Sequence, residues 1–147
     1  RPDTLQRFVH GALYGVQGLA LVAQGDTTRG IAVLDSARVL MAGTNAVNFV
    51  TPIEMRYAML LSSMPTTRRR GIYHLNFGFT ETAQVYPIVQ YYLGRAWEAE
   101  GRLDSASVAY SRFLRLWNDS DSIYQPMLQQ ARDAVQRAAG EGQATTP

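Results

Sequence analysis

Two amphipathic helices joined by a glycine turn occupy the stretch from Tyr91 to Trp117, and this pattern restricts the fold more than any other feature. Apolar residues recur at helical spacing on both sides of Gly101. Gly101 predicts the end of the first helix, because glycine accepts the left-handed backbone of a helix C-terminus at little cost. Asp104 is predicted to cap the second helix by accepting hydrogen bonds from the first backbone N–H groups. The stretch therefore predicts an antiparallel helical hairpin.

The order of small and large residues in this hairpin resembles the tetratricopeptide repeat (TPR) family. The matching residues are Leu93, Gly94, Trp97, Gly101, Ala106 and Tyr110. Gly94 and Ala106 are small, so we expect them to form the closest contact between the two helices. Phe113 and Asn118 depart from the pattern, because the family usually has Ala and Pro near these positions. The resemblance implies a scaffold of stacked helical hairpins that binds protein partners.

A weaker copy of the same pattern lies 76 residues earlier in the chain. Its members are Gly18, Leu21, Gly25, Gly30, Leu34 and Ala37. Gly25 and Asp26 again predict a turn followed by a cap. One helix is expected from about Thr4 to Gln24, and a second to about Met41. Since a TPR is about 34 residues long, the spacing leaves room for one divergent repeat between the two copies.

Proline and threonine residues mark the remaining helices. Thr51 and Pro52 predict a helix start after a loop over residues 43–50, and Pro65 ends that helix. Thr66 or Thr67 is expected to cap the next helix, which runs from Arg68 to about Phe77 and buries Ile72, Tyr73 and Leu75. A linker is expected over residues 78–82. A last helix has a proline in its first turn. Its predicted end is Gly140.

These elements predict an all-α fold, a TPR-like solenoid of about seven helices. The expected organisation is a single TPR-like domain over residues 1–139. Its hairpins cover about 4–42, 51–77 and 84–117, a capping helix covers 124–139, and residues 140–147 form a disordered tail. Because the sequence begins with Arg1, we expect it to be a piece of a longer protein or a processed one.

The first helix contains 18 residues without Asp, Glu, Lys or Arg, between Arg7 and Asp26. A membrane-spanning helix needs about 20 predominantly apolar residues. This run contains His10, two glutamines and four glycines, so we favour a helix of a soluble domain, cytoplasmic or periplasmic. An apolar face left over on this helix would favour a different role, that of a subunit built permanently into a larger assembly.

No catalytic, cofactor-binding or metal-binding pattern is present in the sequence. The chain has no Cys, and its two histidines, His10 and His74, have no second ligand at metal-binding spacing. The glycines do not follow a phosphate-binding order. The net charge of +2 does not call for a nucleic-acid partner. We therefore expect a protein that is not an enzyme and that binds no nucleic acid specifically.

The family resemblance implies a partner-binding groove lined by the first helix of each repeat. By register, that groove would present Leu19, Val22, Ile88, Tyr91, Arg95 and Glu98. A second candidate is the cluster Arg68, Arg69 and Arg70 at a helix start, where the helix dipole disfavours cations. The cluster predicts contact with an acidic partner or an anionic membrane surface; the alternative is a solvated helix start.

Three functions stay open at this stage. The first is a non-catalytic protein–protein interaction scaffold. The second is a structural accessory subunit built permanently into a larger complex, at a membrane surface in one version. The third follows from a resemblance of residues 113–138 to the C-terminal TPR tails of bacterial eukaryotic-like serine/threonine kinases and transcriptional regulators. This resemblance implies that the chain is a sensor or regulatory tail of such a protein.

Overall fold

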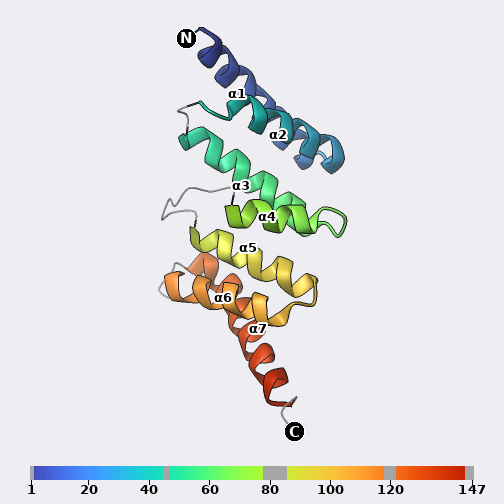
Figure 1. The fold of residues 1–147 in the computed structure, drawn as a ribbon, viewed down its shortest axis with the longest axis vertical. Coiled ribbons are helices and arrows are strands. Elements are labelled where there is room, and N and C mark those ends of the chain that lie inside the picture. The colour runs from blue at the N-terminus through green and yellow to red at the C-terminus, as the bar shows by residue number, and fades with distance from the viewer. Residues whose placement is uncertain (1, 45–46, 78–85, 118–121, 145–147) are drawn as a thin grey trace. The chain divides into compact units, whose positions relative to one another are not determined.

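The regular structure of the chain is entirely helical in the computed structural model, which describes residues 2–44, 47–77, 86–117 and 122–144 (Figure 1). The helices are α1 (Pro2–Ala23), α2 (Thr27–Met41), α3 (Val47–Ser63), α4 (Arg68–Phe77), α5 (Tyr86–Ala99), α6 (Leu103–Trp117), the short 3-10 helix η1 (Ser122–Tyr124) and α7 (Gln125–Ala144). The chain forms two compact units, Arg1–His74 and Leu75–Pro147. The predicted all-α fold of helical hairpins is confirmed, and the solenoid stays a prediction.

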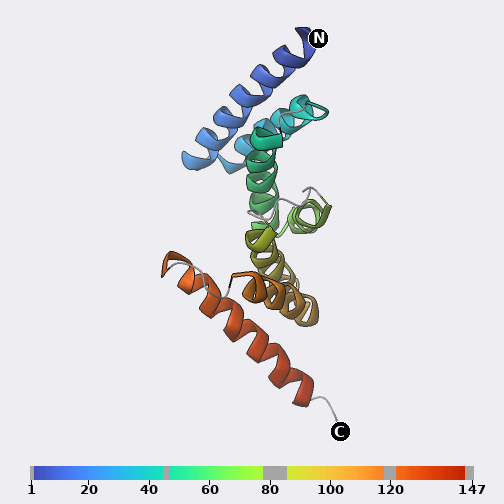
Figure 2. The same ribbon diagram turned by 90° about the vertical axis from the view of Figure 1, so that its left-hand side faces the viewer.

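Glycines bring α1 and α2 into backbone contact in the first unit (Figure 2). A Cβ atom added to Gly18 would lie 3.0 Å from the carbonyl oxygen of Gly30, and one added to Gly30 would lie 2.9 Å from that of Gly18. Leu34 then covers Gly18, with its Cγ 2.7 Å from the added atom. A larger residue at Gly18 or Gly30 would therefore push the two helices apart.

The turn between α1 and α2 has the predicted chemistry. Gly25 adopts a φ of +90°, and the side chain of Asp26 accepts a hydrogen bond from the backbone N–H of Arg29 at 3.2 Å. The predicted turn and cap are both confirmed. Arg7 donates to the carbonyl of Ala42 at 3.1 Å and so ties α1 to the end of α2.

Helix α3 packs across α1 and α2 and completes the core of the first unit. The Cδ1 atom of Ile53 would lie 2.5 Å from a Cβ atom added to Gly15, so α3 reaches α1 at that glycine. The buried residues of this core are Leu34, Ala37, Met41, Ile53, Tyr57 and Leu61. The next hairpin also closes on a glycine, because Gly71 of α4 lies against the backbone of Ser62.

Helix α3 begins at Val47, so the predicted start at Thr51 and the loop over residues 47–50 are wrong. Pro52 is exposed and lies within the first two turns of α3. Because proline has no backbone N–H, the helix loses one hydrogen bond near its start. Helix α4 has the predicted bounds. The hydroxyl of Thr67, one of the two residues predicted to cap α4, donates a hydrogen bond to the Leu61 carbonyl. Tyr73, predicted to be buried, is exposed.

In the second unit, α5 and α6 form the predicted hairpin and α7 packs on α6. Gly94 lies under the ring of Tyr110, whose Cδ1 atom would be 2.6 Å from an added Cβ atom. Tyr110, and not Ala106, is thus the nearest neighbour of Gly94, which corrects the predicted contact pair. A buried cluster in the core of this unit contains Tyr91, Ala106, Tyr110, Phe113, Leu128, Ala131 and Ala134.

The predicted helix end at Gly101 is confirmed, since this glycine adopts a φ of +71° in the turn between α5 and α6. The predicted cap at Asp104 is not. Helix α6 begins at Leu103, and the N–H of Ala106 bonds to the carbonyl of Arg102 at 2.9 Å. Arg102 therefore occupies the cap position, which corresponds to Asp26 in the first hairpin. Asp104 lies inside the first turn.

Helix α7 continues through Gly140 to Ala144, so the predicted helix end and the start of the disordered tail are wrong. Gly140 does not adopt a positive φ, and the flanking residues are strong helix formers such as Ala and Gln. Residues 145–147 lie outside the described part of the chain, as do the predicted linker over residues 78–82 and Asn118.

The core around Ala106 generates a stability prediction. Ala106 is 2% exposed and shares its cluster with Tyr91 and Tyr110, so Ala106→Leu adds three carbon atoms to a closed site. We expect a loss of about 1–3 kcal/mol of unfolding free energy, measured by urea denaturation. Val108 lies two residues away and is exposed, so Val108→Leu is the control and should leave stability unchanged. Equal stability of both variants would contradict the packing described here.

Candidate functional site

The surface of α1 that faces away from α2 and α3 is apolar. Gly11, Gly15 and Gly18 turn toward the core, and the opposite side of the helix is left open. Its exposed side chains are Leu5 (68% exposed), Val9 (44%), Leu13 (62%), Val16 (69%) and Leu19 (38%). We call these five residues the outer α1 face. It carries no charge, since no Asp, Glu, Lys or Arg occurs between Arg7 and Asp26.

The residues predicted to line a groove do not share one environment. Leu19 belongs to the outer α1 face, but Val22 packs against the core and contacts Gly30. Tyr91 is 5% exposed and its hydroxyl donates to Gln130, so it has little surface to offer a partner. Tyr91 is a core residue, which corrects its predicted role, and Val22 is partly buried against the core. The reason is that the glycines set the packing face of each helix closer to these positions than the family register implied.

The other three groove residues lie on α5 in the second unit. Ile88 is half-buried and Arg95 is exposed, with its guanidinium 5.9 Å from the ring centre of Tyr91. Glu98 accepts a hydrogen bond from the Tyr110 hydroxyl at 2.9 Å and forms an ion pair with Arg137 at 2.6 Å. Burial and this carboxylate raise the pKa of Tyr110. Both carboxylate oxygens of Glu98 therefore have partners within the unit.

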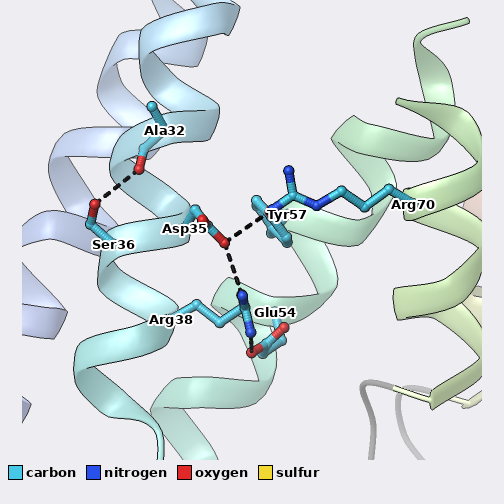
Figure 3. Close-up of polar contacts among 7 residues, drawn as sticks. All are labelled: Ala32, Asp35, Ser36, Arg38, Glu54, Tyr57 and Arg70. Carbon is cyan, nitrogen blue, oxygen red and sulfur yellow. Dashed lines mark hydrogen bonds and ion pairs between the residues drawn. The ribbon is translucent and has the colours of Figure 1, made fainter. Parts of the chain in front are cut away.

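Arg70 of the predicted cationic cluster takes part in a polar network in the first unit (Figure 3). Its guanidinium lies 3.4 Å from the carboxylate of Asp35 and donates to the hydroxyl of Tyr57. Arg38 donates to the same carboxylate at 2.9 Å and lies 3.7 Å from that of Glu54. The network thus connects α2, α3 and α4.

Tyr57 is the centre of this network and is fully buried. The guanidinium carbons of Arg38 and Arg70 lie 5.4 and 5.5 Å from the centre of its ring, within the range of cation–π attraction. Burial and the neighbouring carboxylate of Asp35 raise the pKa of Tyr57 to about 12. The phenol therefore stays protonated and keeps its hydrogen bond to Asp35 at neutral pH.

The carboxylates of the network differ in their ionisation. Burial disfavours the charge on Asp35, but hydrogen bonds from Arg38 and Tyr57 outweigh this effect and lower its pKa. Burial raises the pKa of Glu54, and the attraction of Arg38 offsets this only in part. This network was not predicted from the sequence. Its signal is the i, i+3 spacing of Asp35–Arg38 and Glu54–Tyr57, which places each pair on one side of its helix.

The three arginines of the cluster are not equivalent. Arg68 is half-buried, whereas Arg69 and Arg70 are exposed. Arg70 has a role in the fold, because it contacts Asp35 and Tyr57. The binding of an acidic partner or an anionic surface by the cluster stays a prediction.

The described residues contain no cluster of three or more His, Cys, Asp or Glu side chains able to hold a metal ion. Among the helices of the described segments, none combines the length and the apolar character needed to cross a membrane. No family model, no curated protein and no solved structure matches the chain. The outer α1 face and the network around Tyr57 are therefore the features from which a function has to be argued.

Reversing the charge of Arg70 tests its role in the network. Arg70→Glu would add a third carboxylate to the network, next to Asp35, and remove one cation from the Tyr57 ring, whereas the helix dipole would favour the new charge. We expect a net loss of about 1 kcal/mol of unfolding free energy, because cation–π and ion-pair contacts together exceed the dipole effect. Arg112→Glu, on the exposed side of α6, is the control. A gain in stability for Arg70→Glu would show that the dipole dominates.

His74 makes the stability of the first unit depend on pH. Its ring lies edge-on to Tyr57 at 5.1 Å between centroids, and burial, Arg38 and Arg70 lower its pKa. The unfolded chain then binds a proton at higher pH than the folded chain does, so stability falls as the pH drops through the ordinary histidine range. We expect His74→Gln to flatten the dependence of unfolding free energy on pH between about pH 7 and pH 5. His10→Gln, at an exposed position of α1, should retain it.

Proposed function

We propose that this chain is a non-catalytic protein-interaction scaffold of the TPR type, which docks another protein on the outer α1 face. Two observations support the proposal. The residue pattern of the hairpins resembles the TPR family, whose members bind proteins. Large aliphatic side chains also stand exposed along one side of α1. The second observation carries the proposal, because contiguous exposed apolar surface marks sites of protein interaction.

The energetics of the outer α1 face favour a protein occupant. Full burial of a Val or Leu side chain is worth about 1.5–3 kcal/mol, and five such residues lie exposed side by side. The face has no charge to offer, so the contact surface of the partner must be apolar at its centre. Affinity for this surface is expected to depend little on salt concentration.

An acidic contact through Arg68, Arg69 and Arg70 belongs to the same proposal as a second, electrostatic part. Arg70 already contacts Asp35 and Tyr57, so an acidic partner has to compete with Asp35 for this guanidinium. The contribution of the cluster is therefore smaller than three independent cations would give. It acts mainly on the association rate and weakens as salt is added.

A second candidate function is an accessory subunit that stays permanently in a larger assembly. The outer α1 face favours it as well, because permanent interfaces are more hydrophobic than transient ones. The two functions differ in exchange. A scaffold releases its partner on the time scale of an experiment, whereas a permanent subunit does not exchange with added free chain.

A charge placed on the outer α1 face tests the proposal. Val16→Glu puts a carboxylate at the most exposed residue of the face, and Val108→Glu makes the same change on the exposed side of α6. The wild type and the two variants are each used to capture proteins from the native source. Proteins that bind the wild type and Val108→Glu but not Val16→Glu are identified and then purified. We expect the purified partner to bind Val16→Glu at least about tenfold more weakly than the wild type, by calorimetry. Equal binding of all three chains would remove the outer α1 face from the proposal, and exchange of labelled chain in the complex separates the two candidate functions.

A further inference from the structure

The apolar residues on the open side of α1 follow the spacing of a coiled-coil seam. Successive steps of four and three residues connect Leu5, Val9, Ala12, Val16, Leu19 and Ala23. In a heptad, this alternation places Val9, Val16 and Ala23 at the a positions and the other three residues at the d positions. Ala12 is half-buried and the other five side chains are exposed. The surface is therefore shaped for a second helix that lies along α1.

We propose that this second helix is α1 of another copy of the chain, so that two copies pair through a short coiled coil. The inference rests on the proposed function and names the partner of the outer α1 face. In a twofold interface both copies use the same patch. Valine at a with leucine at d, as at Val9, Val16 and Leu19, favours two parallel strands.

The residues that flank the seam permit self-pairing. Charges at the e and g positions normally select or reject a coiled-coil partner. On one flank of α1 these positions hold Gln6, Leu13 and Ala20, and on the other flank they hold Phe8, Gly15 and Val22. None of these six residues is charged, so a second copy meets no like-charge repulsion at the seam. A different partner would gain no selective ion pair there.

The packing of α1 inside its own unit supports pairing of a short helix. Helix nucleation is costly in water, and most of the stability of a helix in a protein comes from its packing. Here α2 and α3 already hold α1 through Gly11, Gly15 and Gly18. The seam from Leu5 to Ala23 is about 27 Å long. Because α1 is already helical in its unit, pairing does not include the free-energy cost of helix formation. Gly15 and Val22 flank the seam and contact Ile53 and Gly30, so a second helix on the seam would lie beside α2 and α3.

Single cysteines test the pairing directly, because the chain contains no Cys. Val9→Cys and Val16→Cys each place a thiol at an a position, where two parallel strands bring the Cα atoms within disulfide reach. Val108→Cys, on the exposed side of α6, is the matched control. Under mild oxidation we expect disulfide-linked dimers of both seam variants and far fewer of the control. Cross-linking of Val9→Cys to Leu19→Cys in a mixture would also support the pairing, with antiparallel strands.

The molar mass of the unmodified chain provides the second measurement. We expect light scattering at tens of micromolar chain to give twice the monomer mass of 16.3 kDa, and Val16→Glu to give the monomer mass with an unchanged circular dichroism spectrum. A wild type that stays monomeric, with seam cysteines that cross-link no more than the control, overturns the inference. If such a monomeric chain still binds a purified native partner that Val16→Glu does not bind, another protein occupies the face and the proposed function stands. If instead Val16→Glu binds the purified native partner as well as the wild type does, both proposals fail.

Discussion

The contact between the glycine side of α1 and the helices α2 and α3 determines which surface the first unit leaves open. Gly18 and Gly30 bring two backbones together, and Gly15 admits the end of Ile53. A helix that approaches its neighbours through glycines hides little side-chain surface of its own. The aliphatic residues of α1 consequently remain on the opposite side, where Leu5, Val9, Leu13 and Val16 are exposed. The exposed apolar face is thus a direct result of how the hairpin closes.

The network around Tyr57 connects helices that the glycine contacts alone do not hold. Two guanidiniums lie near a buried phenol ring, and Asp35 accepts hydrogen bonds from Arg38, Tyr57 and Arg70. Such a network is costly to disturb, since removal of one partner leaves the other polar groups partly buried and unmatched. It also limits what Arg70 can do at the surface. A cation that serves the fold is only partly available to a partner, and this distinction was not visible in the run of three arginines.

Local chemistry was enough to predict most of the fold. The glycines with positive φ at 25 and 101, the cap at Asp26 and the bounds of α4 follow from backbone preferences of single residues. The predictions failed where contacts with neighbouring residues determine the local structure. Asp104 lost the cap position because the preceding turn places Arg102 there, and Gly140 stays helical without a turn to make. In the predicted groove, Tyr91 lies in the core and Val22 packs against it, because the glycines of each hairpin set its packing face.

The same reasoning predicts that the two proposed interaction surfaces of the first unit differ in strength. Burial of an aliphatic face gains free energy in proportion to area and is insensitive to salt, whereas exposed guanidiniums gain little once water and ions screen them. Leu5, Val9 and Val16 have no partner in the described part of the chain that would compete for their surface, but Arg70 has Asp35. Affinity should therefore come mainly from α1. In the proposed function, the arginines at the start of α4 would influence the rate and direction of approach, because their field extends into solvent before any contact forms.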